Sequence, residues 1–183
     1  MKRIIKLNWL GVGLLAIAMT VRAAETNTIA RRVGVYDSRV VAYAWFWSEA
    51  TQAHLKQQMN AARAARQAGD QDKLKSDSEA LRAFQDQMHR EVLSTAPDSE
   101  AMAMINARLP ELEQTAGVSQ LVSKWDEPAL AKFKESVRVD VTDEMVHLIL
   151  KPTEKQMHVI EGIKKAAPAP LTECDKLIQE GKI

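Results

Sequence analysis

The side chains that could perform chemistry in this 183-residue chain are scattered along it. A metal site built on one helix would need ligands at i, i+3 or i+4. The four histidines show no such spacing with one another or with the single cysteine; they are His54, His89, His147 and His158, and the cysteine is Cys174. We therefore expect no metal centre.

The remaining candidates for catalysis are also weak. Asp37 and Ser38 are adjacent, but no G-x-S-x-G motif surrounds them, so the pair is better explained as a helix cap. Glu49, Asp86 and Glu91 are expected on solvated helix faces, and the seven glycines form no phosphate-binding loop. We expect a protein without catalytic residues or cofactors, and a small enzyme remains the alternative.

The N-terminus has the pattern of an export signal. Lys2 and Arg3 precede an uncharged apolar run at residues 9–21, which is shorter than the roughly 20 residues of a membrane span. We expect a cleaved signal peptide over residues 1–23, cut after Ala23. An uncleaved segment would instead anchor the chain in the inner membrane.

Charge and cysteine content limit the partners. Removal of the four basic residues in the signal segment would change the net charge from +1 to −3. A mildly acidic chain has no basic field for nucleic acid, so we expect no nucleic-acid partner. Cys174 can form no internal disulfide, so packing or oligomerisation must stabilise the fold. This cysteine, expected in a mobile tail, could form an intermolecular disulfide or remain an inert thiol.

A short strand is expected at about Arg32–Tyr36, after the signal segment. Val33 and Val35 alternate there with other residues, which is the period of a strand. A long helix is expected from Ser38 to Ala68. Its base is aromatic on several sides, so more than one neighbour should enclose it. We expect these aromatic residues to pack where sheet meets helices, or at a subunit interface, the alternative being a client- or membrane-contacting patch; they are Tyr43, Trp45, Phe46 and Trp47.

A second long helix is expected at about 72–93, after a stop and cap at Gly69-Asp70. Its apolar residues repeat every seven positions, which favours coiled-coil pairing with the first helix as an antiparallel hairpin. The candidate arm or client contacts are Leu55, Met59, Leu74, Leu81, Phe84 and Met88. The alternative is that packing between the two helices buries all six of these apolar residues.

Shorter elements complete the pattern. Residues 99–116 suggest a third helix, kinked or broken at Pro110. Strands are expected at Val118–Trp125, as the partner of the first strand, and at 136–141, where Val137, Val139 and Val141 share one face. Further expected elements are a helix at 143–150 capped by Thr142, a helix at 154–165, a Pro-rich linker at 166–170 and a tail with at most a short amphipathic turn.

The fold class expected is α+β, mostly α. A small antiparallel or mixed sheet forms the body, and an antiparallel helical hairpin at about 38–116 protrudes from it. A single domain would cover residues 24–165, followed by a linker and short tail at 166–183.

This order of elements resembles the Skp/OmpH-like family of periplasmic chaperones. The matching segments are RVGVYDSR at residues 32–39, the returning strand Val118–Trp125 and VDVTDEM at residues 139–145. The likeness covers roughly residues 31–150. It implies a periplasmic homotrimer whose strands form a central body and whose hairpins surround a cavity that holds unfolded outer-membrane proteins.

The chain departs from that pattern in three ways. Pro97 and Pro110 interrupt the return arm, residues 152–183 extend beyond the usual end, and the arm is nearly balanced in charge where the family's arms are typically basic. We expect an exported, non-enzymatic, ATP-independent chaperone-like protein that binds unfolded or assembling envelope proteins. The alternative is a membrane-anchored scaffold or assembly subunit of the envelope.

Overall fold

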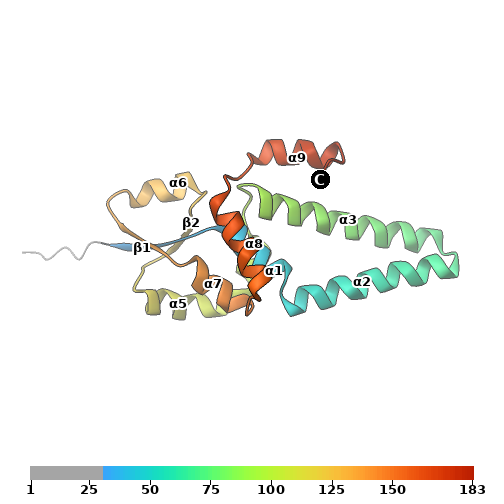
Figure 1. Cartoon of the computed structure of the whole chain (residues 1–183), viewed down its shortest axis with the longest axis horizontal. Coiled ribbons are helices and arrows are strands. Elements are labelled where there is room, and N and C mark those ends of the chain that lie inside the picture. The colour runs from blue at the N-terminus through green and yellow to red at the C-terminus, as the bar shows by residue number, and fades with distance from the viewer. Residues whose placement is uncertain (1–30) are drawn as a thin grey trace, which may run out of the picture.

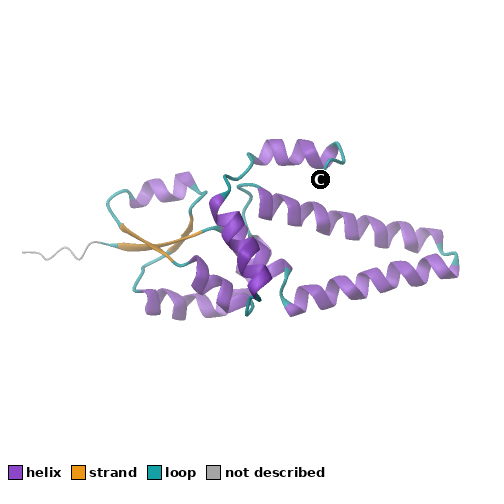
Figure 2. Ribbon diagram, in the orientation of Figure 1, coloured by secondary structure: helices purple, strands orange, loops and turns teal. Residues whose placement is uncertain are grey.

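The computed structural model describes residues 31–183, so the expected signal peptide and its cleavage after Ala23 lie outside the described residues. The described chain is α+β and mostly helical, with one small sheet at one end and two long helices extending from the other (Figures 1 and 2). Among residues 31–183, no helix combines the length and apolar character needed to cross a membrane.

The sheet has three strands, and all of them are parallel. β1 (Arg32–Tyr36) is central, with β2 (Leu121–Ser123) on one side and β3 (Val137–Asp140) on the other. The prediction of an antiparallel or mixed sheet was therefore wrong. Both neighbours of β1 lie far downstream, and the intervening helices carry the chain back so that each strand enters from the same end.

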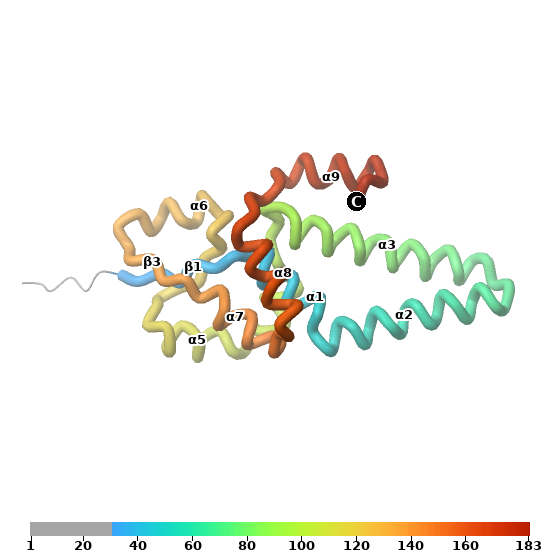
Figure 3. Tube along the Cα trace, viewed as in Figure 1, coloured from blue at the N-terminus to red at the C-terminus, as the bar shows by residue number. Residues whose placement is uncertain are grey.

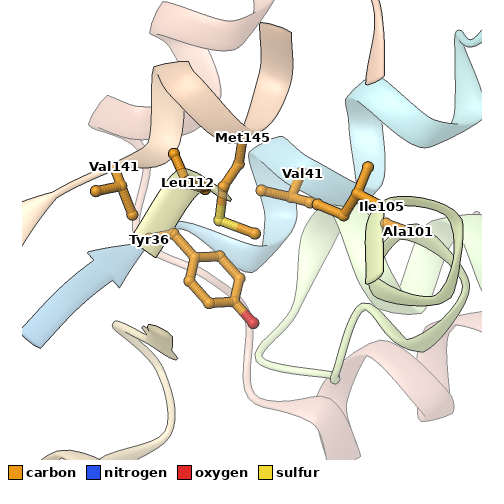
Figure 4. Packing of buried hydrophobic residues seen from close by; sticks show 7 residues of the cluster. All are labelled: Tyr36, Val41, Ala101, Ile105, Leu112, Val141 and Met145. Carbon is orange, nitrogen blue, oxygen red and sulfur yellow. The ribbon is translucent and has the colours of Figure 1, made fainter. Parts of the chain in front are cut away.

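The helix α1 (Ser38–Phe46) follows β1 directly and forms the centre of the body. It packs against four helices, which confirms that several neighbours enclose it; they are α3 (Gln71–Leu93), α4 (Ser99–Ile105), α7 (Thr142–Ile149) and α8 (Glu154–Lys165). Two of its faces therefore serve different parts of the core: Val41 joins the cluster shown in Figure 4, while Val40 and Ala44 join a second cluster against α8.

Two long helices, α2 (Glu49–Ala68) and α3 (Gln71–Leu93), extend from this body and meet at Gly69 (Figure 3). Gly69 has a φ of 70°, a left-handed conformation that favours glycine, and Asp70 caps α3, as predicted. The single helix predicted from Ser38 to Ala68 is wrong in one respect. It breaks after Phe46, where Ser48 caps α2 by accepting a hydrogen bond from Thr51 N.

The segment 99–116 breaks as its proline predicts. A 3₁₀ turn at Asn106–Arg108 separates α4 from α5 (Leu109–Ala116), and Pro110 lies in the first turn of α5, where its missing N–H costs nothing. Between β2 and β3 the chain forms α6 (Glu127–Leu130) and a second 3₁₀ turn at Ala131–Phe133.

The second and third strands are shorter than predicted. Val118–Trp125 is extended only at Leu121–Ser123. In β3, Val137 is half-exposed because the strand lies at the sheet edge, whereas Val141 lies beyond the strand and is buried. Thr142 is not the cap of α7. It is the first residue of that helix, and its hydroxyl accepts a hydrogen bond from Asp37 N (3.0 Å).

The C-terminal segment is more ordered than the sequence suggested. After the linker, α9 (Leu171–Gln179) packs beside α3, and Ala169 forms an isolated parallel bridge with Ser94. Cys174 is 1% exposed, so its expected place in a mobile tail was wrong. Thr153 forms a full capping box with Gln156 at the start of α8, which confirms the predicted helix start.

Candidate functional site

Polar side chains gather where the three parallel strands end. Asp37 follows β1, Lys124 and Trp125 follow β2, and Thr142 follows β3. The carboxyl ends of parallel strands meet at one edge of a sheet, which is where open α/β sheets place their ligands. This edge of the sheet is therefore a candidate ligand-binding site.

Asp37 is the hub of this polar cluster and is fully buried. It accepts hydrogen bonds from Arg39 Nη2 (3.0 Å) and Trp125 Nε1 (2.8 Å), and Lys124 Nζ lies 2.6 Å from it. Burial alone would raise the pKa of the Asp37 carboxyl, but the hydrogen bonds from these three side chains outweigh it and lower the pKa. The carboxylate is thus held ionised.

These contacts assign Asp37 a structural role. Arg39 also donates to the carbonyl oxygen of Ile163 (2.8 Å), and its guanidinium stacks over the Trp125 ring at 4.8 Å. One buried ion pair thereby ties β1, β2 and α8 together. Since the donors surrounding Asp37 already occupy its oxygens, it has no free position from which to exchange a proton with a substrate.

A second buried carboxylate, Asp98, has a different environment. It is 4% exposed, and Tyr36 Oη donates to its Oδ1 at 3.4 Å, which is a long hydrogen bond. Burial raises the pKa of Asp98 to about 7, and the negative charge of Glu91 adds to the rise. Burial, followed by the charge of Asp98, also raises the pKa of Tyr36.

Asp98 and Glu91 each keep one oxygen without a partner. Within residues 31–183, Asp98 Oδ2 and Glu91 Oε2 are buried and accept no hydrogen bond. Glu91 was expected on a solvated face, and that prediction was wrong because the base of α3 packs into the body, leaving it 5% exposed. Burial raises its pKa as well, against the hydrogen bond from Gln87.

Asp98 and Tyr36 face a groove beside β2. The cavity has a volume of about 480 Å³, within the range of ligand-binding pockets. One wall is β2 itself and the others are the two segments that flank it, at residues 95–98 and 125–129; the lining includes Pro97, Gln120, Leu121, Ser123 and Trp125.

The six predicted arm contacts lie on α2 and α3, and none of them is buried. Met59 is 50% exposed, and the other five are partly exposed. In each helix the buried residues lie near the ends: Thr51 and Ala65 in α2, Glu91 and Val92 in α3. The arm therefore keeps accessible apolar surface in the single chain.

The four aromatic residues lie at the junction of α1 with the arm. Trp45 and Phe46 contact Phe84 of α3, with ring centroids 5.7 and 5.8 Å apart. Tyr43 is partly buried and packs toward α8, while Trp47 is 43% exposed. Trp45 and Phe46 thus lie at the base of the arm, and Trp47 lies at the surface.

The histidines do not converge with other ligands. Among the described residues, no three His, Cys, Asp or Glu side chains lie close enough to hold a metal ion. His54 contacts Gln58, and His147 contacts the carbonyl oxygen of Asp143. Glu49 and Asp86 lie on the arm helices, on exposed and partly exposed positions respectively.

Sequence reasoning missed the groove and its buried acid. In the sequence, Asp98 is only the residue that precedes the helix expected at 99–116, and Lys124 and Trp125 are only the end of an expected strand. A usable signal exists, because each predicted strand is followed at once by polar or charged residues. That signal points to one site only if the strands are parallel, since antiparallel strands would send their ends to opposite edges.

The chain was also compared with known proteins. No family model matches it, no curated protein matches it, and no solved structure matches it.

Proposed function

We propose that this protein is a non-enzymatic, ATP-independent chaperone-like protein of the cell envelope, which binds unfolded or assembling polypeptides along α2 and α3. The observation that carries the proposal is the accessible apolar surface of this arm. Met59 is half-exposed, and Leu55 and Leu81 are only partly covered. Methionine and leucine on a protruding element can adapt to many apolar partners.

The charge of the arm fits a weak, adaptable contact. Taken together, α2 and α3 carry acidic and basic residues in nearly equal number, so no single sign of charge would select the client. Selection would then come from apolar side chains, which are exposed in unfolded chains and buried in folded ones. The resemblance to Skp/OmpH-like chaperones supports unfolded outer-membrane proteins as clients and a homotrimer as the assembly.

The test is an aggregation assay with the full chain. An unfolded outer-membrane β-barrel protein is diluted from urea with and without this protein, and light scattering is followed. We expect the folded protein to delay aggregation, and Met59→Gln to weaken the delay at least about twofold, because a polar amide replaces an apolar contact.

Met104→Gln is the matched control. Met104 lies on α4, away from the arm, and is 41% exposed, so the substitution makes the same chemical change at a similar exposure. It should leave the delay unchanged. The proposal is abandoned if the correctly folded protein neither delays aggregation nor binds the unfolded chain. Sedimentation of the same sample tests the trimer separately, and a monomer would exclude the cavity arrangement.

A further inference from the structure

The outer edge of β2 is unpaired. Gly34 N donates to the carbonyl oxygen of Gln120 (2.9 Å), and Lys124 N donates to that of Tyr36 (2.8 Å). Alternate residues of a strand direct their peptide groups to opposite sides, so Leu121 and Ser123 direct theirs away from β1. Outside the β1–β2 ladder, no backbone hydrogen bond within residues 31–183 involves Leu121 N, Leu121 O or Ser123 N.

This edge is open but not flat. The groove of about 480 Å³ is lined by Gln120–Ser123 and by the segments 95–98 and 125–129. Its lining mixes apolar residues such as Pro97 and Pro128 with the acids Asp98 and Asp126, and the strand adds free backbone donors and an acceptor. An extended polypeptide has the matching arrangement, because its own peptide groups could pair with the edge while alternate side chains enter the groove.

The other edge of the sheet is less suited to a partner strand. On β3, Val137 is half-exposed and the charged side chain of Arg138 is exposed. Charged residues on an edge strand oppose pairing with another chain. Of the two outer strands, β2 is therefore the one whose edge is open to a partner strand.

The charge of the groove selects the side chain that the partner must carry. Asp98 lines the groove, is 4% exposed and keeps Oδ2 without a partner. The charge of Glu91, which has a buried unpartnered oxygen of its own, acts on Asp98. In the same body, Asp37 is compensated by Arg39 and Lys124. No Lys or Arg of the described chain lies within 4.0 Å of the Asp98 or Glu91 carboxylates. A cation is the missing complement.

We propose that the groove beside β2 binds an extended segment of another polypeptide, which adds as a strand to the free edge of β2 and places a lysine or arginine side chain against Asp98. This binding mode is separate from contacts along the arm. It stands whether or not the arm delays aggregation, because its test uses a short peptide and no aggregating protein.

The probe is a fluorescent heptapeptide of alternating threonine and valine with a central lysine, blocked at both ends, and its affinity is measured by fluorescence polarisation. The same peptide with glutamate or norleucine at the centre supplies the comparison. We expect the lysine peptide to bind at least about tenfold more tightly than either, because its ammonium meets a buried carboxylate. No binding of the lysine peptide, or equal binding of all three, overturns the proposal.

Asp98→Asn tests the acid, and Asp70→Asn is the matched control. Both residues precede a helix, and asparagine caps as well as aspartate does, but Asp70 lies at the exposed tip of the arm. Asp98→Asn should remove the preference for lysine, and Asp70→Asn should keep it. If Asp98→Asn retains the preference while circular dichroism shows a normal fold, the assignment of Asp98 is wrong.

Two N-methylated peptides test the strand pairing on the unaltered protein. One carries N-methyl groups on its even residues and the other on its odd residues, so each blocks the hydrogen bonds of one peptide edge. One of the two should lose binding and the other should keep it. If both bind like the parent, or both fail, strand addition at β2 is excluded.

Discussion

Trp125 Nε1 donates a 2.8 Å hydrogen bond to Asp37 Oδ1, and the two residues follow adjacent parallel strands. The bond joins β2 to the start of α1, and the Trp125 ring lies under the guanidinium of Arg39. A residue that looks like a simple helix cap in sequence is therefore the point at which the sheet and the central helix are locked together.

Replacing Asp37 by asparagine should destabilise the fold strongly. Arg39 is 2% exposed, and without the carboxylate its charge would be buried without a counter-ion. We expect a loss of about 3–5 kcal/mol in the free energy of unfolding, measured by urea denaturation. Asp70→Asn, at the exposed tip of the arm, should change it by less than about 0.5 kcal/mol. A small effect of Asp37→Asn would show that the cluster contributes little.

Asp98→Asn should make the protein more stable at high pH. The pKa of Asp98 is about 7 in the folded chain against an ordinary value of 3.8. The contribution of its protonated carboxyl to stability is therefore greatest below pH 3.8 and is lost as the pH rises through 7. Relative to the variant, the free energy of unfolding of the unmodified protein should fall by about 2–3 kcal/mol between pH 5 and pH 8. Urea unfolding at both values measures this, and parallel behaviour of the two proteins would contradict it.

Gly34 and Gly162 should respond oppositely to alanine. A Cβ on Gly34 would lie 2.7 Å from Leu121 Cδ2 and 3.2 Å from Val118 Cγ2, so packing around β1 must shift. We expect Gly34→Ala to cost about 1–3 kcal/mol. Gly162 in α8 has open space around the same position, so Gly162→Ala should stabilise by about 0.5–1 kcal/mol. Thermal unfolding compares the two, and equal effects would disprove the packing argument.

The Cys174 thiol should react slowly in the folded protein. Its side chain is buried between α9 and α3, and burial raises the pKa of the thiol, which lowers the fraction of reactive thiolate. Labelling by Ellman's reagent should be at least about tenfold slower than in urea. Fast labelling of the native chain, or a disulfide-linked dimer on non-reducing gels, would show that α9 does not stay docked.

Trp45 and Trp47 should differ in their contribution to stability. Trp45 contacts Phe84 and the main core cluster, whereas Trp47 is 43% exposed. We expect Trp45→Ala to cost about 2–4 kcal/mol and Trp47→Ala less than about 1.5 kcal/mol, in urea unfolding. The reverse order would mean that the surface position of Trp47 is occupied by another part of the protein in solution.

Local signals in the sequence predicted much of the fold. The alternation at Val33 and Val35 located β1, the glycine at Gly69 located the turn of the arm, and Pro110 located a break. Each of these features is decided by a residue and its near neighbours, through backbone geometry and hydrogen-bonding capacity. Such features can be read without knowing the rest of the chain.

Strand direction and burial depend on distant parts of the chain and were not predicted. The sequence of β2 does not indicate that the strand runs parallel to β1, and its three residues are too few for a periodic signal. Asp98 and Cys174 have polar or ambiguous sequence surroundings, and their burial follows from the docking of other elements. The groove beside β2 follows from the parallel arrangement and could not be found before it.

The central position of β1 affects the order in which the elements form as the chain is synthesised. β1 is made early, yet both of its partners follow some eighty to a hundred residues later, at Leu121 and Val137. Contacts of such high sequence separation form slowly, while helices such as α2 and α3 form locally and fast. A growing chain would therefore complete its arm first, and β1 would stay unpaired on both edges until the last third of the chain is made.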